Sequence, residues 1–412
     1  MNSINLPKPL SPTVLSSIEM LERLVAFPSV SRDSNLPLID WVEDYLQPFG
    51  ARCRRTANAE GSKANLFAAI GPEAEGGVVL SGHTDVVPVD GQDWHTDPFT
   101  LTEREGLLYG RGTSDMKGFS AVFLSRLATL DIAAMNKPLY LALSYDEEVG
   151  CLGVDRMVDD AMQHFPKPDF AIIGEPTSMR IVRAHKSINC FRTVITGKAA
   201  HSSQPHLGAG AIIAAGRIIE HLDGIGRARR AEGSNAHCEP PWTTVQVGTI
   251  QGGTAVNILP SHCEFLWEYR ALPDEDPDLV VNAMQEFIDE HVLPDLREFA
   301  PQATIETSAL SRVPPLTPDP EARAEQWVRG LQGVRDGGTG EVSFATEAGS
   351  FQRAGVSSVV CGPGSIDQAH QPNEFIDPAE LTRCEAMIDD VFAYLCASRA
   401  ESQCFAGDAQ KV

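Results

Sequence analysis

Six ionisable side chains of the chain are of the types that bind metal ions, and they stand at or after the ends of apolar runs. They are His83, Asp115, Glu147, Glu148, Glu175 and His370. Carboxylates and imidazoles without a thiolate suit Zn²⁺ or Co²⁺. A set of this size suits two ions that share one carboxylate, so the pattern predicts a two-metal centre able to activate water.

Each of these residues also has an ordinary structural explanation. The stretch SYDEEVG, with Glu147 and Glu148, reads alone as a solvated turn after a strand, because adjacent carboxylates repel one another. The Gly-rich stretch YGRGTSDMKG around Asp115 resembles loops that hold phosphate, but it has neither the G-x-G-x-x-G nor the G-x-x-x-x-G-K-[ST] pattern. Nucleotide binding is therefore the weaker interpretation.

His83 has a carboxylate, Asp85, two residues further along the strand-like run VVLSGHTDVVP. Residues two apart on an extended chain point to the same side. A carboxylate commonly holds one imidazole nitrogen while the other nitrogen binds a metal. The spacing therefore indicates that Asp85 orients His83, with a surface histidine beside a turn as the alternative.

The elements that must position these residues alternate between apolar strands and amphipathic helices as far as about residue 186. This alternation predicts an α/β domain with a mixed, mostly parallel sheet flanked by helices. Between 187 and 307 the order changes to β-α-β-β-α-β, which is the ferredoxin-like arrangement. We therefore expect a discontinuous α/β domain, 1–186 and 308–412, interrupted by an α+β insert, 187–307.

Composition narrows the possible partners and the compartment. A chain of 412 residues with a net charge of −23 favours two domains and disfavours nucleic acid and anionic membranes as partners. Nine cysteines without a C-x-x-C pair fit reduced thiols. With no apolar signal core or membrane-length run, the sequence predicts a cytoplasmic protein.

Seven motifs, in order along nearly the whole chain, resemble one family. They are SGHTDVVP, GRGTSDMKG, DEEVG, GEPT, GKAAHSSQPHLGAGAI, GGTAVNILP and QAHQPNEF. They resemble the dinuclear zinc metallopeptidase family of acetylornithine deacetylase, succinyl-diaminopimelate desuccinylase, aminoacylase and carboxypeptidase G-type enzymes. The stretch 343–375 is most similar to the acetylornithine deacetylase branch. The resemblance implies a zinc-exopeptidase-like fold whose insert serves as lid and dimerisation domain.

The resemblance also implies a role for each motif residue. His83 and Glu175 would bind one zinc ion, Glu148 and His370 the other, and Asp115 both, with Co²⁺ as a possible substitute. Asp85 would orient His83, and Glu147 would be the general base. His201 would stabilise the negative oxygen of the tetrahedral intermediate from the partner subunit of a homodimer. The peptide bond from Asp115 to Met116 would be cis.

The substrate implied by the resemblance is an N-acyl amino acid, with N²-acetyl-L-ornithine first and release of ornithine and acetate in arginine biosynthesis. Its α-carboxylate would be bound by groups of the insert, Asn257 and Arg270. Lys186 would add positive charge to this site, with a hinge residue between the domains as the alternative. Glu347 would bind the distal ammonium group of the substrate. The alternative is that Glu347 stands at a helix N-terminus, where its negative charge is favourable to the helix dipole.

Two other functions stay open at the level of sequence. One is a deacylase of another substrate, such as acetylcitrulline, an acetylated diamino acid or succinyl-diaminopimelate, or a dipeptidase. The other is a catalytically silent module that binds an amino acid or a metal.

Overall fold

The computed structural model describes residues 14–233, 238–335 and 340–398, and these form two compact units. Unit 1 takes its residues from Met1–Arg183, Pro318–Gly340 and Thr346–Val412. Unit 2 takes its residues from Ala184–Thr317 and Glu341–Ala345, and it contains the whole of the predicted insert.

Unit 1 is built on an eight-stranded sheet in the order β1-β2-β6-β3-β7-β16-β8-β15. The four central strands, β6 (Leu139–Ser144), β3 (Val78–His83), β7 (Phe170–Ile173) and β16 (Ser357–Val360), are parallel. The antiparallel β1 (Arg52–Ala57) and β2 (Ala64–Ile70) extend the sheet on one side, and β8 (Val182–His185) and β15 (Gly340–Val342) on the other. This mixed, mostly parallel sheet confirms the predicted fold class.

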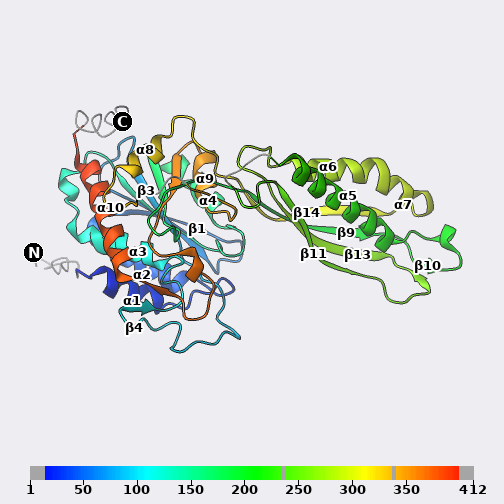
Figure 1. The fold of residues 1–412 in the computed structure, drawn as a ribbon, viewed down its shortest axis with the longest axis horizontal. Helices are drawn as coiled ribbons and strands as arrows, with labels where there is room; N and C mark the ends of the chain where they lie inside the picture. Colours follow the sequence, from blue (N-terminus) through cyan, green and yellow to red (C-terminus); the bar gives the residue numbers. More distant parts are fainter. Residues whose placement is uncertain (1–13, 234–237, 336–339, 399–412) are drawn as a thin grey trace, which may run out of the picture. The chain divides into compact units, whose positions relative to one another are not determined.

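Strands β3 and β6 are buried at every position rather than at alternate positions, as expected of central strands covered on both faces. The helices of unit 1 include α1 (Ser17–Val25), α2 (Leu36–Leu46), α3 (Lys117–Arg126), α4 (Val154–His164), α8 (Arg323–Arg329), α9 (Ala348–Arg353) and α10 (Pro378–Cys396). Helix α1 begins at a capping box in which Ser16 and Glu19 bond to each other's main chain. Helix α3 packs against α1 and α10 (Figure 1) and is buried on nearly all sides.

A second, small sheet of unit 1 joins two segments that are far apart in the sequence. It has the order β17-β5-β4, with β4 (Thr102–Arg104), β5 (Leu107–Tyr109) and β17 (Phe375–Ile376). Strand β17 pairs with β5 through Phe375 with Tyr109 and Ile376 with Leu108. The segment that follows β5 carries Asp115, and the segment that precedes β17 carries His370.

Unit 2 has the predicted β-α-β-β-α-β order. Its elements are β9 (Ile188–Thr196), α5 (Ala211–Glu232), β11 (Thr244–Gly252), β13 (His262–Arg270), α6 (Leu279–Phe287), α7 (Leu293–Phe299) and β14 (Thr304–Val313). The strands form an antiparallel sheet in the order β11-β13-β9-β14, and the helices lie over one of its faces (Figure 1). Buried residues alternate along β9 and β13, as in a sheet with one covered face.

Two further observations concern the whole described chain. None of the helices in the described residues is long and apolar enough to cross a membrane. The cysteines at positions 53, 151, 190, 238, 263, 361, 384 and 396 are free thiols.

Candidate metal centre

The parallel order of the central strands brings four of the predicted ligands to one edge of the sheet. His83 ends β3, Glu148 follows β6, Glu175 follows β7, and His370 follows β16. These strands are neighbours in the sheet, and the carboxyl ends of parallel strands share an edge. Asp115 reaches the same place from the segment between β5 and α3.

The five residues form two groups that share Asp115. His83, Asp115 and Glu175 offer ligand atoms within 4.8 Å of one another, and so do Asp115, Glu148 and His370. In the first group His83 Nε2 lies 3.1 Å from Asp115 Oδ1. In the second, His370 Nε2 lies 2.8 Å from Glu148 Oε2 and 3.5 Å from Asp115 Oδ2.

The chemistry of the two groups fits divalent cations. The carboxyl groups of Asp115, Glu148 and Glu175 are buried together, which is costly for anions without a positive partner. Glu175 Oε1 is buried and has no hydrogen-bond partner among the described residues. Burial and the neighbouring carboxylates of Glu147 and Asp115 raise the pKa of Glu175 well above its ordinary value. Oxygen and imidazole donors in this arrangement suit Zn²⁺ or Co²⁺.

The pKa of Asp115 shifts in the opposite direction to that of Glu175. Burial would raise the pKa of Asp115, but hydrogen bonds from His370 and His83 hold the pKa below its ordinary value. The peptide bond from Asp115 to Met116 is cis, which confirms the expectation drawn from the family resemblance.

Asp85 contacts His83 through its main chain rather than its carboxylate. His83 Nδ1 donates to the Asp85 carbonyl oxygen at 2.8 Å, whereas the nearest carboxylate oxygen is 3.7 Å away. The carboxylate instead accepts from the Ser31 hydroxyl at 2.7 Å and from the main-chain N–H groups of Glu147 and Glu148, at 3.1 and 3.3 Å. In this structure the Asp85 side chain mainly holds the turn after β6, and its role in orienting His83 stays a prediction.

Glu147 belongs to neither ligand group. Its Oε1 accepts a hydrogen bond from the Cys151 thiol at 3.3 Å, and its carbonyl accepts from the N–H groups of Gly150 and Cys151. Burial raises the pKa of Glu147 well above its ordinary value, and the carboxylates of Glu148 and Glu347 raise it further. A carboxyl group with a raised pKa beside a metal centre has the properties of a general base.

Asp146, for which the sequence offered no role, forms an ion pair with Lys63. Lys63 Nζ lies 2.5 Å from Asp146 Oδ1 and also donates to the Ser31 carbonyl oxygen. Asp146 has a φ of 58°, a left-handed conformation that is uncommon outside glycine. Lys63 and Ser31 therefore both support the acidic turn, which is the stretch after β6 with Asp146, Glu147 and Glu148. Neither Lys63 nor Ser31 was identified as a site residue from the sequence.

Glu347 lies at the start of α9 with a buried side chain that is 1% exposed. It is the N-cap residue of α9, as the helix-dipole alternative requires, although its side chain makes no capping hydrogen bond, so both interpretations of Glu347 stay predictions. Its Oε2 accepts from the Ser81 hydroxyl at 3.3 Å, and its Oε1 has no hydrogen-bond partner within the described residues. Burial raises the pKa of Glu347 to about 7.

The other predicted site residues lie in unit 2. His201 in β10 (Ala200–His201) pairs with Ile258 of β12 (Ile258–Leu259), and the Ser202 N–H donates to the Asn257 carbonyl at 3.0 Å. This antiparallel pairing of β10 with β12 places His201 and Asn257 side by side, and both residues are exposed.

Arg270 and Lys186 already have partners in unit 2. Arg270 Nε lies 3.3 Å from Glu268 Oε1. Lys186 is buried, and its Nζ donates to the carbonyl oxygens of Pro240 and Trp242, both at 2.7 Å. Burial lowers the pKa of Lys186. These contacts fix Lys186 within its own unit, and its substrate-binding role stays a prediction.

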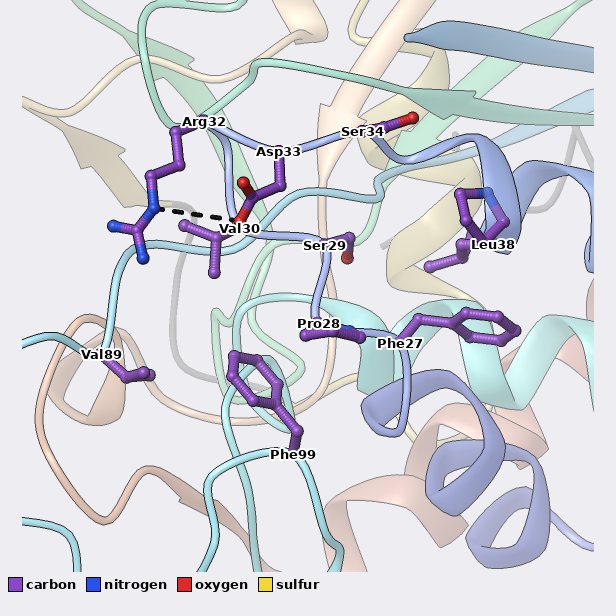
Figure 2. A pocket seen from close by; sticks show the side chains of 11 residues that line it. Phe27, Pro28, Ser29, Val30, Arg32, Asp33, Ser34, Leu38, Val89 and Phe99 are labelled. Carbon is purple, nitrogen blue, oxygen red and sulfur yellow. Dashed lines mark ion pairs between the residues drawn. The ribbon is translucent and has the colours of Figure 1, made fainter. Parts of the chain in front are cut away.

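A cavity of about 320 Å³ in unit 1 is separate from this centre, because none of the candidate ligands lines it. Figure 2 shows its apolar walls, including Phe27, Val89 and Phe99, and the ion pair between Arg32 and Asp33 at 3.9 Å. Ser31, which donates to the Asp85 carboxylate, belongs to the same segment as the lining residues Val30 and Arg32 but does not itself line the cavity.

Comparison with known proteins is consistent with this geometry. The model of the family "Peptidase family M20/M25/M40" matches residues 79–393. Acetylornithine deacetylase from Myxococcus xanthus is 36% identical over 384 residues, 92% of this chain and 97% of that relative. The enzyme of the same name from Pectobacterium atrosepticum is 35% identical over 386 residues, 92% of this chain and 97% of the relative.

Solved structures show the same fold at low sequence identity. The M20 family metallo-carboxypeptidase Sso-CP2 from Sulfolobus solfataricus aligns with a TM-score of 0.69 at 17% identity, over 93% of this chain and 99% of that one. A dinuclear metal binding peptidase of the M20 family from Bacillus subtilis aligns with a TM-score of 0.63 at 17% identity, over 92% and 97% of the two chains.

Proposed function

We propose that this chain, which belongs to the peptidase family M20/M25/M40, is a dinuclear zinc hydrolase that converts N²-acetyl-L-ornithine and water to L-ornithine and acetate. The observation that carries the proposal is a buried carboxyl group, that of Glu147, beside two metal-ligand groups without belonging to either. The relatives from M. xanthus and P. atrosepticum, both named acetylornithine deacetylase, support the substrate and a place in arginine biosynthesis.

In this proposal His83, Asp115 and Glu175 would hold one Zn²⁺ ion, and Asp115, Glu148 and His370 the other, with Co²⁺ as a possible substitute. When bound, such ions lower the pKa of water and polarise a carbonyl oxygen. The Glu147 carboxylate takes a proton from the attacking water and then delivers it to the nitrogen as the amide C–N bond breaks. The hydroxyl group stays on the acetyl carbon, and the products are acetate and the free amine.

The chain's other groups would orient the reactants. Asp85 and Cys151 hold the main chain and carboxylate of Glu147. His201 would donate a hydrogen bond to the substrate carbonyl oxygen as that oxygen becomes negative. Asn257 and Arg270 would bind the α-carboxylate, because a guanidinium group forms paired hydrogen bonds to carboxylates.

Glu347 is proposed to bind the distal ammonium group of ornithine. A buried carboxylate oxygen without a hydrogen-bond donor favours a cationic partner. Glu347→Gln is expected to lower kcat/KM for N-acetylornithine by about 10²-fold, since truncating one member of a buried charge pair costs roughly 2–5 kcal/mol. The value for N-acetylmethionine, which has no such cation, should change little. An unchanged preference between the two substrates would exclude this role.

We also propose that the protein is a homodimer formed through unit 2. Three apolar side chains of this unit are largely exposed. The relative exposures of Ile213, Ile250 and Val256 are 73%, 50% and 102%. Ile213 and Val256 line one shared groove of this unit, and an exposed apolar surface favours a protein interface. The dimer would supply His201 to the site of the partner subunit.

Co-expression of two inactive variants tests the exchange of His201. His201→Ala and Glu147→Gln would each be nearly inactive alone. If His201 acts across the dimer, each mixed dimer has one complete site of its two, so mixed dimers should show about half of wild-type activity. Activity is measured on tagged, purified mixed dimers. No restoration would place His201 in its own subunit's site or outside catalysis.

A panel of N-acyl amino acids distinguishes the remaining functions. The panel contains N-acetylornithine, acetylcitrulline, an acetylated diamino acid, succinyl-diaminopimelate and a dipeptide. Turnover of N-acetylornithine above the others, lost with a chelator and restored by Zn²⁺, is the expected result. Turnover of another member would identify a different deacylase or a dipeptidase, and binding without turnover would identify a silent module.

A further inference from the structure

The carboxylate of Glu374 holds the main chain of the segment that presents Asp115. Its Oε1 accepts from the N–H groups of Ser114 and Asp115, at 2.8 and 3.0 Å, and its Oε2 accepts from that of Gly112 at 2.9 Å. Its own carbonyl accepts from the Gly110 N–H at 2.9 Å. This side chain is completely buried, so the segment before α3 is built around it.

Arg111 connects this carboxylate to the segment that presents His370. Its Nη1 donates to Glu374 Oε2 at 2.8 Å and to the Gln371 carbonyl at 3.2 Å. Its Nη2 donates to Gln92 Oε1 at 2.6 Å, and Gln92 Nε2 donates to the His370 carbonyl at 3.0 Å. An unbroken series of hydrogen bonds therefore runs from the main chain of Asp115 to that of His370.

Stability alone is a poor explanation for this buried pair. The side chains of Arg111 and Glu374 are 1% and 0% exposed, and the cost of removing two charges from water offsets most of their attraction. Apolar side chains of similar volume would serve the core as well. What apolar side chains cannot provide is four directed hydrogen bonds to two chain segments, and those bonds fix geometry.

We propose that Arg111 and Glu374 are positioning residues that set the distance between Asp115 and His370 and so determine the affinity of the centre for its second ion. The inference rests on the proposed two-ion centre. His83 and Glu175 extend from neighbouring central strands, so the Asp115–Glu175 group has its own support. His370 follows a long segment after β16 and depends on contacts of this kind, because its side chain is 54% exposed.

Zinc titration of the metal-free full-length chain, in competition with a chromophoric chelator, tests the inference. Wild type should bind two ions. Glu374→Gln puts an N–H₂ group against main-chain N–H groups. Gln92→Ala breaks the link from Arg111 to His370 and also removes the hydrogen bond from Trp94, but it leaves Glu374 and its bonds to the Asp115 segment in place. In both variants one ion should bind about 10–100-fold more weakly, as for other losses of groups that support metal ligands. In Gln92→Ala, which does not touch the Asp115 segment, the other ion should bind as in wild type, and raised Zn²⁺ should restore kcat in both variants.

Glu380→Gln is the matched control, since Glu380 is also a buried acid of unit 1 but pairs with Arg335. It should leave both zinc affinities unchanged. Two ions bound equally well by wild type and both site variants would overturn the inference while leaving the proposed function intact. If the affinities for both ions fall equally and the metal-free variants also unfold at a lower temperature, Arg111 and Glu374 have only a structural role. A wild type that binds no zinc would overturn the proposed centre itself.

Discussion

Glu147→Gln is expected to bind zinc like the wild type and to lose turnover by about 10³-fold or more. Glu147 contributes no atom to either ligand group, so its replacement leaves both groups intact. General acid or base catalysis by one side chain typically contributes about 10²–10⁴-fold, and Glu147 would act first as base and then as acid. The glutamine amide keeps the shape of the side chain but cannot accept a proton from the attacking water.

Single-turnover rates and metal content of the same preparation provide the measurement. KM for N-acetylornithine should change little, because the residue binds the attacking water rather than the substrate. Cys151→Ala provides a comparison, since it removes only the hydrogen bond to Glu147 Oε1 and should reduce kcat far less. A Glu147→Gln variant that retains substantial turnover would show that another group transfers the proton.

Asp115→Ala is expected to abolish the two-ion centre. Asp115 is the only residue common to both groups, so each group would lose one of its ligands. Metal analysis after dialysis against Zn²⁺ should show less than one ion per chain, and hydrolysis should be undetectable. The stabilisation that zinc gives the wild type, about 2.7 kcal/mol for one site at a concentration of 100 Kd, should also be lost.

Without metal the same substitution has two opposing effects on stability. Removing the Asp115 carboxylate relieves its repulsion of Glu147 and Glu175, but it also removes the hydrogen bonds from His83 and His370 that lower the pKa of Asp115. Denaturant unfolding of the two metal-free proteins should therefore show only a small difference in stability. A large loss of stability without metal would mean that Asp115 serves the fold rather than an ion. If Asp115→Ala binds zinc as the wild type does, Asp115 is not a ligand of the centre.

Local patterns predicted the four parallel strands and the ligands at their ends. Apolar runs such as VVLSGH mark buried strands, and strands alternating with helices form parallel sheets whose carboxyl ends meet. This reasoning brought His83, Glu148 and Glu175 to one edge. That one face of the unit 2 sheet is covered was likewise predicted, from the alternation of apolar and polar residues along β9 and β13.

The supporting contacts were not predictable in this way because they join distant segments. Lys63 and Asp146 are 83 positions apart, and Arg111 and Glu374 are 263 apart. Neither pair leaves a periodic signal, and a buried arginine or lysine looks like a surface residue in the sequence. The choice between the carbonyl and the carboxylate of Asp85 as partner of His83 depends on backbone dihedrals, which residue spacing does not specify.

The sharing of Asp115 has a consequence for how the protein would respond to metal supply. Two ions held by the same carboxylate would not load independently, because the first would fix the orientation of Asp115 for the second and its charge would repel the second. When free metal is scarce, the fully loaded fraction grows with the square of the metal concentration. Hydrolysis would then fall more steeply during metal starvation than in an enzyme with one ion, which couples this activity to metal homeostasis.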